Sequence, residues 1–151
     1  MIEPLTIPGV RVSRTNSMQM LRQIVQMTGN GSKLVIFSYS VTDGWLRQLM
    51  KLKQEYQVQH ITLVLDRAVM IRHREKLLQI ERVADECYLT DSHAKVYLSQ
   101  GETKSIALIT SANATNNYRA ECYYGTDRPT ELEQITRDIR GILANSDRIT
   151  G

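Results

Sequence analysis

The sequence predicts a single α/β domain in which helices flank a mixed β-sheet. Two continuous apolar runs rich in β-branched residues, at 32–40 and 60–66, have the pattern of strands buried on both faces. A helical pattern follows each run, which indicates a βαβ arrangement with parallel strands. Four short strand patterns between residues 84 and 125 then precede a closing helix. The length of 151 residues suits one domain, and no linker or internal repeat divides the chain.

The N-terminal part of the chain predicts an extension followed by a helix. Residues 1–15 are expected to form a loop or an edge strand, because their two prolines discourage a central strand. The segment 15–31 then has the apolar spacing of three and four residues that is typical of a helix. Thr15 or Asn16 can cap its beginning, and Gly29 ends it.

The middle of the chain alternates strands and helices. After the strand at 32–40, Thr42 or Asp43 can cap a helix of about fourteen residues. The second buried strand, 60–66, leads into a basic helix over 68–82.

The last third predicts a cluster of strands and one amphipathic helix. Strands are expected at 84–90, 93–99, 105–111 and 119–125. Pro129 suits the first turn of the closing helix. The apolar face of that helix consists of Leu132, Ile135, Ile139, Ile142 and Leu143.

The amino-acid composition is that expected of an ordinary soluble globular protein. Its net charge of +3 is mildly basic, which favours a phosphate-bearing partner. No window approaches the ~18 apolar residues of a membrane span, and the N-terminus lacks a signal-peptide pattern, so we expect a cytoplasmic protein with no membrane partner. Cys87 and Cys122 each lie in an apolar-aromatic run, and we expect buried free thiols.

Five polar side chains converge in the predicted strand cluster. His93 and Lys95 are two residues apart and would point to the same face of a strand at 93–99. A hairpin would bring Ser111 and Asn113, where the next strand ends, beside them. The following strand returns Glu121 to the same neighbourhood. The sequence therefore predicts one patch with an imidazole, an ammonium, a hydroxyl, an amide and a carboxylate.

This set suits cleavage of a phosphodiester without a metal or another cofactor. A neutral imidazole can attack phosphorus and form a phosphohistidine, which divides one difficult displacement into two easier ones. Glu121 is our candidate for the carboxylate that would orient the ring of His93. Lys95, Ser111 and Asn113 would hold the non-bridging oxygens as negative charge develops on them.

The same residues resemble the signature of the phospholipase D superfamily. The sequence H-x-K at 93–95, S-x-N at 111–113 and Glu121 are similar to the family motifs HxKxxxxD and GSxN. The order of strands and helices over residues 20–145 is also similar, so the resemblance implies a phospholipase D-like mixed sheet. It further implies that His93 is the nucleophile and that Lys95 and Asn113 bind phosphate. Small single-motif endonucleases of the Nuc type build this site across a homodimer, and the single motif here implies the same arrangement.

The sequence departs from the family pattern at two positions and in the interval from His93 to Asn113, which is three residues longer than usual and which the loop at 100–104 could absorb. One segment also has an alternative interpretation. Gln100 occupies the position of the motif aspartate, which Glu102 could partly replace, and Thr110 occupies that of the glycine. Residues 113–117 also suit an Asn/Thr-rich turn whose side chains cap the backbone, and we favour that interpretation for Asn116 and Asn117.

These observations predict a hydrolase of the phosphodiesterase class, a nuclease acting on DNA or RNA. The arginines and lysines of the basic helix would either supply affinity for nucleic acid or form a solvated helix face. One alternative is a catalytically degenerate domain that binds nucleic acid. Another is a phospholipase or phosphatidyl transferase.

Overall fold

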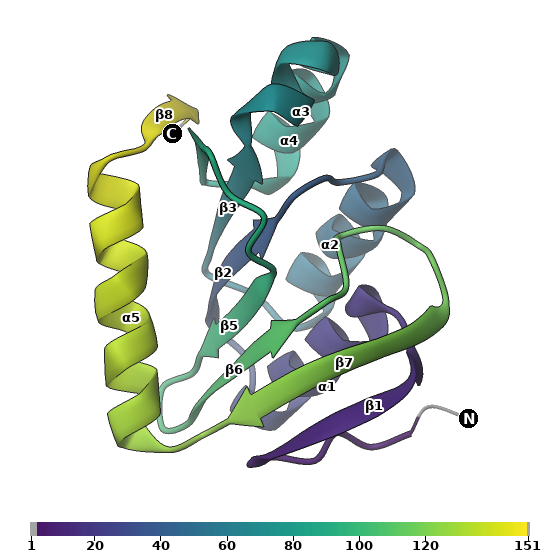
Figure 1. Cartoon of the computed structure of the whole chain (residues 1–151), viewed down its shortest axis with the longest axis vertical. Helices are drawn as coiled ribbons and strands as arrows, with labels where there is room; N and C mark the ends of the chain where they lie inside the picture. The colour runs from purple at the N-terminus through teal and green to yellow at the C-terminus, as the bar shows by residue number, and fades with distance from the viewer. Residues whose placement is uncertain (1–2, 151) are drawn as a thin grey trace.

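An eight-stranded β-sheet runs through the computed structural model, which describes residues 3–150 (Figure 1). The strands are β1 (Gly9–Thr15), β2 (Lys33–Ser38), β3 (His60–Asp66), β4 (Glu86–Thr90), β5 (Val96–Gln100), β6 (Ser105–Thr110), β7 (Arg119–Thr126) and β8 (Asp147–Thr150). They lie in the order β1-β7-β6-β5-β2-β3-β4-β8. The pairs β2–β3 and β3–β4 are parallel, and the remaining neighbours are antiparallel. The predicted α/β fold with a mixed sheet is confirmed.

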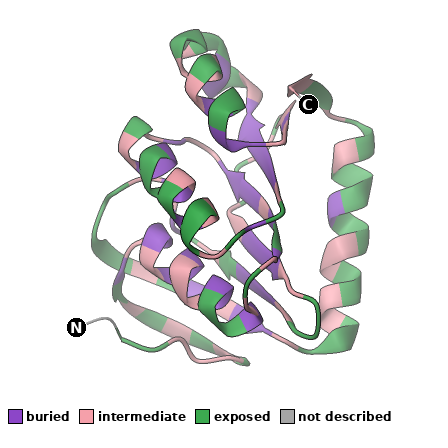
Figure 2. Cartoon of the chain, turned by 180° about the vertical axis from the view of Figure 1, so that it is seen from behind, coloured by how far each residue is buried: buried purple, intermediate pink, exposed green. Residues whose placement is uncertain are grey.

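Helices cover the two faces of the sheet unequally (Figures 1 and 2). They are α1 (Ser17–Thr28), α2 (Asp43–Glu55), α3 (Arg67–Arg72), the 3-10 turn η1 (Arg74–Lys76), α4 (Leu77–Val83) and α5 (Pro129–Ala144). Buried side chains of α1, α2 and α4 share the larger core with one face of the sheet. Helix α5 packs alone on the other face, where Ile139 lies against Phe37, Val64 and Leu98.

Local side-chain hydrogen bonds start the first two helices where the sequence predicts. The Asn16 side-chain oxygen accepts a hydrogen bond from the backbone N–H of Gln19 at 2.9 Å, and Thr42 Oγ1 accepts one from Trp45 at 3.3 Å. Each bond satisfies a donor that the first turn of a helix leaves free. Gly29 follows α1 with a φ of 91°, a value that glycine adopts without strain.

The basic segment and the end of the chain differ from the sequence prediction. The single helix expected over 68–82 is wrong, because the backbone leaves helical geometry at His73 (φ −129°, ψ 47°). The turn is held by Lys76 Nζ, which donates to the Val41 carbonyl at 2.7 Å. Strand β8 was not expected, since its four residues Asp-Arg-Ile-Thr are too short and polar to show a strand pattern. It pairs with β4 at the sheet edge, and Arg67 forms an ion pair with Asp147.

At the opposite sheet edge, β1 pairs only with β7, which agrees with the expected N-terminal edge strand. Within residues 3–150, no helix has the length and apolar character that crossing a bilayer requires.

We expect Gly101→Ala to destabilise the fold by about 1–3 kcal/mol, the usual cost of overpacking. A Cβ at this position would meet the backbone carbonyl oxygens of Thr28 and Lys104, neither of which can rotate away. Gly141→Ala is the matched control, because nothing lies within 4 Å of its added Cβ in α5. It should stabilise the helix by about 0.5–1 kcal/mol. Urea unfolding of the three proteins measures both effects; equal midpoints would contradict the expectation.

Candidate active site

The predicted site residues gather at the end of the sheet where its parallel strands have their carboxyl ends. Strands β2 and β3 end there, and Tyr39 and Asp66 mark their carboxyl ends. The segment before β5, with His93, and the segment after β6, with Asn113, reach the same edge because both strands pair antiparallel within this part of the sheet. Glu121 lies near the start of β7. The sheet topology thus brings these residues, far apart in the sequence, into one region.

Asn113 is held by the end of β2. Its Oδ1 accepts a hydrogen bond from the backbone N–H of Tyr39 at 3.1 Å, and it lies 3.3 Å from Ser38 Oγ, whose hydroxyl donates to the Ser40 carbonyl. Ser38 Oγ also accepts from the backbone N–H of Ala114 at 2.8 Å, which fixes the turn after β6. Because the amide oxygen is engaged by the protein, the amide N–H₂ of Asn113 is the group left to donate to an anion.

His93 is exposed and stacks on Tyr39. The two ring centroids lie 4.4 Å apart, and the rings are inclined by 18°. Tyr39 therefore contacts both His93, through its ring, and Asn113, through its backbone. Stacking fixes the plane of the imidazole and leaves its edge, which carries the ring nitrogens, uncovered by the tyrosine ring.

The strand expected over 93–99 begins only at Val96, so His93 and Lys95 precede β5. Local hydrogen bonds explain the difference: the Ser92 N–H donates to Asp66 Oδ1 at 3.1 Å, and the Ala94 N–H donates to Ser92 Oγ at 3.0 Å. These two backbone N–H groups are therefore not available for hydrogen bonds to a neighbouring strand. The orientation of His93 follows from its contact with Tyr39, and the two-residue alternation of a strand does not apply.

Hydrogen bonds to backbone carbonyls connect Lys95 to His93, and the residue before Ser111 to Lys95. Lys95 Nζ donates to the His93 carbonyl at 2.8 Å, and the Lys95 carbonyl accepts from the Thr110 N–H at 3.0 Å. Ser111, the next residue along, accepts from the Cys122 N–H at 3.1 Å through its Oγ. The ammonium group is therefore close to His93 and is free to exchange an intramolecular carbonyl for an incoming anion.

A small pocket at this edge contains three of the five predicted residues. Ser111, Asn113 and Glu121 line it together with Ser40 and Arg119. His93 and Lys95 lie outside its lining, and within residues 3–150 no hydrogen bond joins His93 to Glu121. In one chain the predicted residues therefore form two neighbouring groups that meet at Tyr39.

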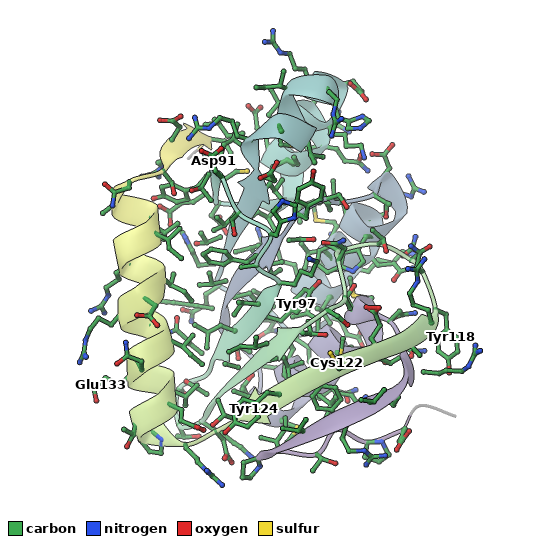
Figure 3. The ribbon with its side chains drawn as sticks, in the orientation of Figure 1. Asp91, Tyr97, Tyr118, Cys122, Tyr124 and Glu133 are labelled. Carbon is green, nitrogen blue, oxygen red and sulfur yellow. The ribbon has the colours of Figure 1, made fainter. Side chains whose placement is uncertain are left out.

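Beneath the pocket lies the buried hydroxyl of Tyr97, which donates to the Ala112 carbonyl at 2.9 Å. Burial raises the pKa of Tyr97 above its ordinary value, and the negative charge of Glu121 adds to the increase. The hydroxyl therefore stays protonated as a donor. Glu121 precedes Tyr123 by two residues on β7, and Tyr123 belongs to the same buried core as Tyr97 (labelled in Figure 3), so Glu121 lies on the same side of the sheet as Tyr97.

Sequence reasoning missed Tyr39, Ser40 and the supporting role of Asp66. Their positions after buried strands could have indicated them, because polar residues at the carboxyl ends of parallel strands commonly line sites. Asp66 is buried and accepts hydrogen bonds from Ala68 and Ser92, which links the end of β3 to the segment that precedes His93.

Gln100 and Glu102 lie at the other end of β5 from His93. Both contribute to a separate surface hollow beside Asn30 and Lys33. The replacement of the motif aspartate by Gln100 is therefore remote from the candidate site, and Glu102 does not reach that site from this position. Within residues 3–150, no group of three or more His, Cys, Asp or Glu side chains is arranged to hold a metal ion.

Comparison with solved structures identifies the fold. The chain is similar to Nuc from Salmonella typhimurium, a phospholipase D family member, with a TM-score of 0.64 and 12% identity over 95% of this chain and 99% of that one. Polyphosphate kinase from Porphyromonas gingivalis gives a TM-score of 0.64 and 17% identity, over 99% of this chain and 25% of the kinase. The archaeal chromatin protein TrmBL2 gives 0.57 and 11%, over 93% of this chain and 55% of that one. No protein-family model matches the sequence, and no curated protein matches it.

The chain therefore has the phospholipase D-like fold, as the resemblance in its motifs implies. At these identities the similarity concerns the fold, and the function has to be argued from the site.

Proposed function

We propose that this chain is a metal-independent phosphodiesterase, a nuclease whose active site is shared by two copies of the chain. The observation that carries the proposal is the contact of Tyr39 with both His93 and Asn113. This contact brings a nucleophile and a phosphate-binding amide to the same edge of the sheet, with Lys95 beside them.

In the proposed mechanism, a ring nitrogen of His93 attacks phosphorus and the bond to the leaving oxygen breaks. The leaving oxygen takes a proton from the protonated imidazole of His93 of the partner subunit. That imidazole, now neutral, removes a proton from a water molecule, which attacks the phosphohistidine and releases the phosphomonoester. Both histidines return to their starting states.

Lys95 and the amide N–H₂ of Asn113 would stabilise the charge on the non-bridging oxygens in both steps. The surroundings support an anion there. The Thr42 N–H, at the beginning of α2, donates to the Ala114 carbonyl at 3.1 Å, and Ser17 Oγ, at the beginning of α1, donates to the Thr115 carbonyl at 3.5 Å. Two helix N-termini, each with a partial positive charge, therefore adjoin the turn after Asn113.

Nucleic acid is our preferred substrate. The net charge of the chain is +3. Arg72 and Arg74 are exposed, and they belong to the segment in which Lys76 donates a hydrogen bond to the Val41 carbonyl. Val41 in turn forms a bridge with Ala114, next to Asn113. Positive charges on a segment connected to the site in this way would attract a phosphate backbone in a salt-dependent manner.

The fold similarity to a DNA-binding chromatin protein favours a second candidate, a binding module without turnover. The two functions are separated by hydrolysis of bis(p-nitrophenyl) phosphate, with and without EDTA, alongside DNA binding at several salt concentrations. Hydrolysis that EDTA does not reduce supports the phosphodiesterase. Salt-dependent DNA binding with no hydrolysis under any condition would select the binding module.

Tyr39→Ala should lower kcat by about 10–100-fold, because small misplacements of a reacting group carry costs of this order. Tyr39→Phe should keep nearly full activity, since stacking on His93 requires the ring and not the hydroxyl. Measuring kcat and KM for both variants on the same diester tests the positioning role. A phenylalanine variant as poor as the alanine variant would contradict it.

A further inference from the structure

Tyr118 differs from the other tyrosines of the chain in its contacts. Six of the seven have a stacked ring or a hydrogen bond through the hydroxyl, namely Tyr39, Tyr56, Tyr88, Tyr97, Tyr123 and Tyr124. Within residues 3–150, Tyr118 has neither, and it is 55% exposed directly before β7 (Figure 3). A single exposed ring is ordinary on a protein surface, so its role depends on what surrounds it.

A hollow of about 160 Å³ lies beside Tyr118, and we call it the Tyr118 hollow. Residues of the N-terminal segment, β1, the first turn of α1 and β7 line it. Tyr123 in its lining is buried, and the Tyr123 hydroxyl accepts a hydrogen bond from the Thr6 N–H at 2.9 Å. The hollow is smaller than the roughly 300–1,000 Å³ of pockets that enclose a whole ligand, so it suits one flat group laid against a ring.

The Tyr118 hollow adjoins the pocket of the candidate active site. Ser13 and Thr15 of the hollow lie opposite Glu121 and Arg119 of the pocket in the pairing of β1 with β7. Opposite residues of an antiparallel pair point to the same face of the sheet. The hollow and the pocket are therefore neighbours on one face.

Alternate residues of β1 and β7 point to the other face. Val12 and its partner Cys122 lie there, and both are exposed. The expected burial of Cys122 is therefore wrong, whereas Cys87 is buried as predicted. Val12 shares a strand with the Tyr118 hollow but points away from it.

The charges around the hollow favour a polyanion. Arg14 lines the hollow, Arg119 lines the adjoining pocket, and both are exposed. Glu3, which also lines the hollow, forms an ion pair with Arg11 that offsets its negative charge. Guanidinium groups beside an exposed aromatic ring suit a strand in which phosphates alternate with bases.

We propose that the Tyr118 hollow binds an unpaired base of a single-stranded nucleic acid, whose chain continues from there to the scissile phosphate. The inference rests on the proposed function and names its substrate as a single strand. Every base has a flat face that can stack on an aromatic ring, so the contact is independent of sequence. In a duplex these faces are covered by the neighbouring base pairs, so Tyr118 favours the unpaired strand.

Binding of a fluorescent oligothymidylate, and of its duplex with oligoadenylate, tests the hollow. Both are measured in His93→Ala protein, which separates binding from cleavage, and the single strand should bind more tightly than the duplex. Adding Tyr118→Ala should weaken single-strand binding by about 5–100-fold, the range for loss of one stacked base, and should leave duplex binding nearly unchanged. Tyr118→Phe should bind like the parent, because stacking requires the ring and not the hydroxyl. Val12→Ala is the matched control, since Val12 is 73% exposed on the other face of β1.

A second readout reports the stacking itself. The fluorescence of 2-aminopurine in the oligonucleotide is quenched when that base stacks, so quenching on binding should disappear in Tyr118→Ala and return in Tyr118→Phe. Circular dichroism establishes that the variants fold. With His93 present, Tyr118→Ala should hydrolyse bis(p-nitrophenyl) phosphate at the wild-type rate, because this small diester has no strand that extends to the hollow.

The outcomes separate the hollow from the proposed function. Single-strand binding that Tyr118→Ala leaves unchanged, a phenylalanine variant as weak as the alanine variant, or a duplex bound as tightly as the single strand would each overturn the assignment of the hollow. None of these results would affect the cleavage of small diesters by the wild type. Stacking on Tyr118 in a wild-type chain that cleaves no diester would support the hollow and contradict the proposed phosphodiesterase.

Discussion

His93→Ala is expected to reduce kcat for hydrolysis of a phosphodiester by a factor of about 10⁴ or more, the scale seen when an enzyme loses its nucleophile. The reason is specific: the variant lacks the nitrogen that forms the bond to phosphorus, and in the shared site both copies also lose the acid for the leaving group. Binding of the diester should change little, because phosphate contacts are assigned to Lys95 and Asn113.

The effect on folding should be small. His93 is exposed, and its ring contact is the stack on Tyr39, worth about 0.5–1.5 kcal/mol for an aromatic pair. His73→Ala is the matched control, since His73 lies between α3 and η1 and its ring Nδ1 lies 3.4 Å from Glu75, away from the predicted site residues. The control should retain full activity. A His93→Ala variant within tenfold of wild type would rule out His93 as the nucleophile.

Asn113→Ala should lower kcat by about 10²–10³, the range for removing one donor that stabilises developing negative charge. It should also lower stability by about 1–3 kcal/mol, because the Tyr39 N–H would lose its acceptor. The substitution therefore combines a catalytic and a structural effect.

Asn113→Asp separates the two effects. The carboxylate keeps an acceptor for the Tyr39 N–H, so unfolding by urea should remain close to wild type. It puts a negative charge in place of the amide donor, so cleavage should fall at least as far as in the alanine variant. Asn117→Ala, in the same pocket, is the control, and both its cleavage rate and its urea unfolding should be close to wild type. Full cleavage by Asn113→Asp would contradict the assignment of this amide to phosphate.

The fold was largely predictable because local signals and the global arrangement agree. Asn16 and Thr42 cap their helices, and the two β-branched runs form the parallel pair β2 and β3. The prediction failed where contacts between residues distant in sequence determine the local structure. Helical periodicity continues through His73, whereas the hydrogen bond from Lys76 to Val41, a residue distant in sequence, supports the turn in the structure. The apolar neighbours of Cys122 suggested burial, yet it lies on the open face of β7.

The site was predictable in part for the same reason. Ser111, Asn113 and Glu121 share a pocket because the strand order brings the ends of β6 and β7 together, as the motif spacing indicated. The detailed position of His93 depends on Asp66 and Tyr39, which are distant in sequence. Tyr39 follows an apolar strand and resembles core in the sequence, so its contacts with two site residues could be found only in three dimensions.

The central claim is that the His93 ring forms a covalent bond to phosphorus. Rapid mixing with bis(p-nitrophenyl) phosphate, quenching in alkali and mass spectrometry of the digested protein test it most directly. The expected result is a p-nitrophenylphosphoryl group on the peptide that contains His93, formed as the first p-nitrophenolate is released. A burst of p-nitrophenolate with the group on another residue, or with no modified peptide at all, would contradict the claim.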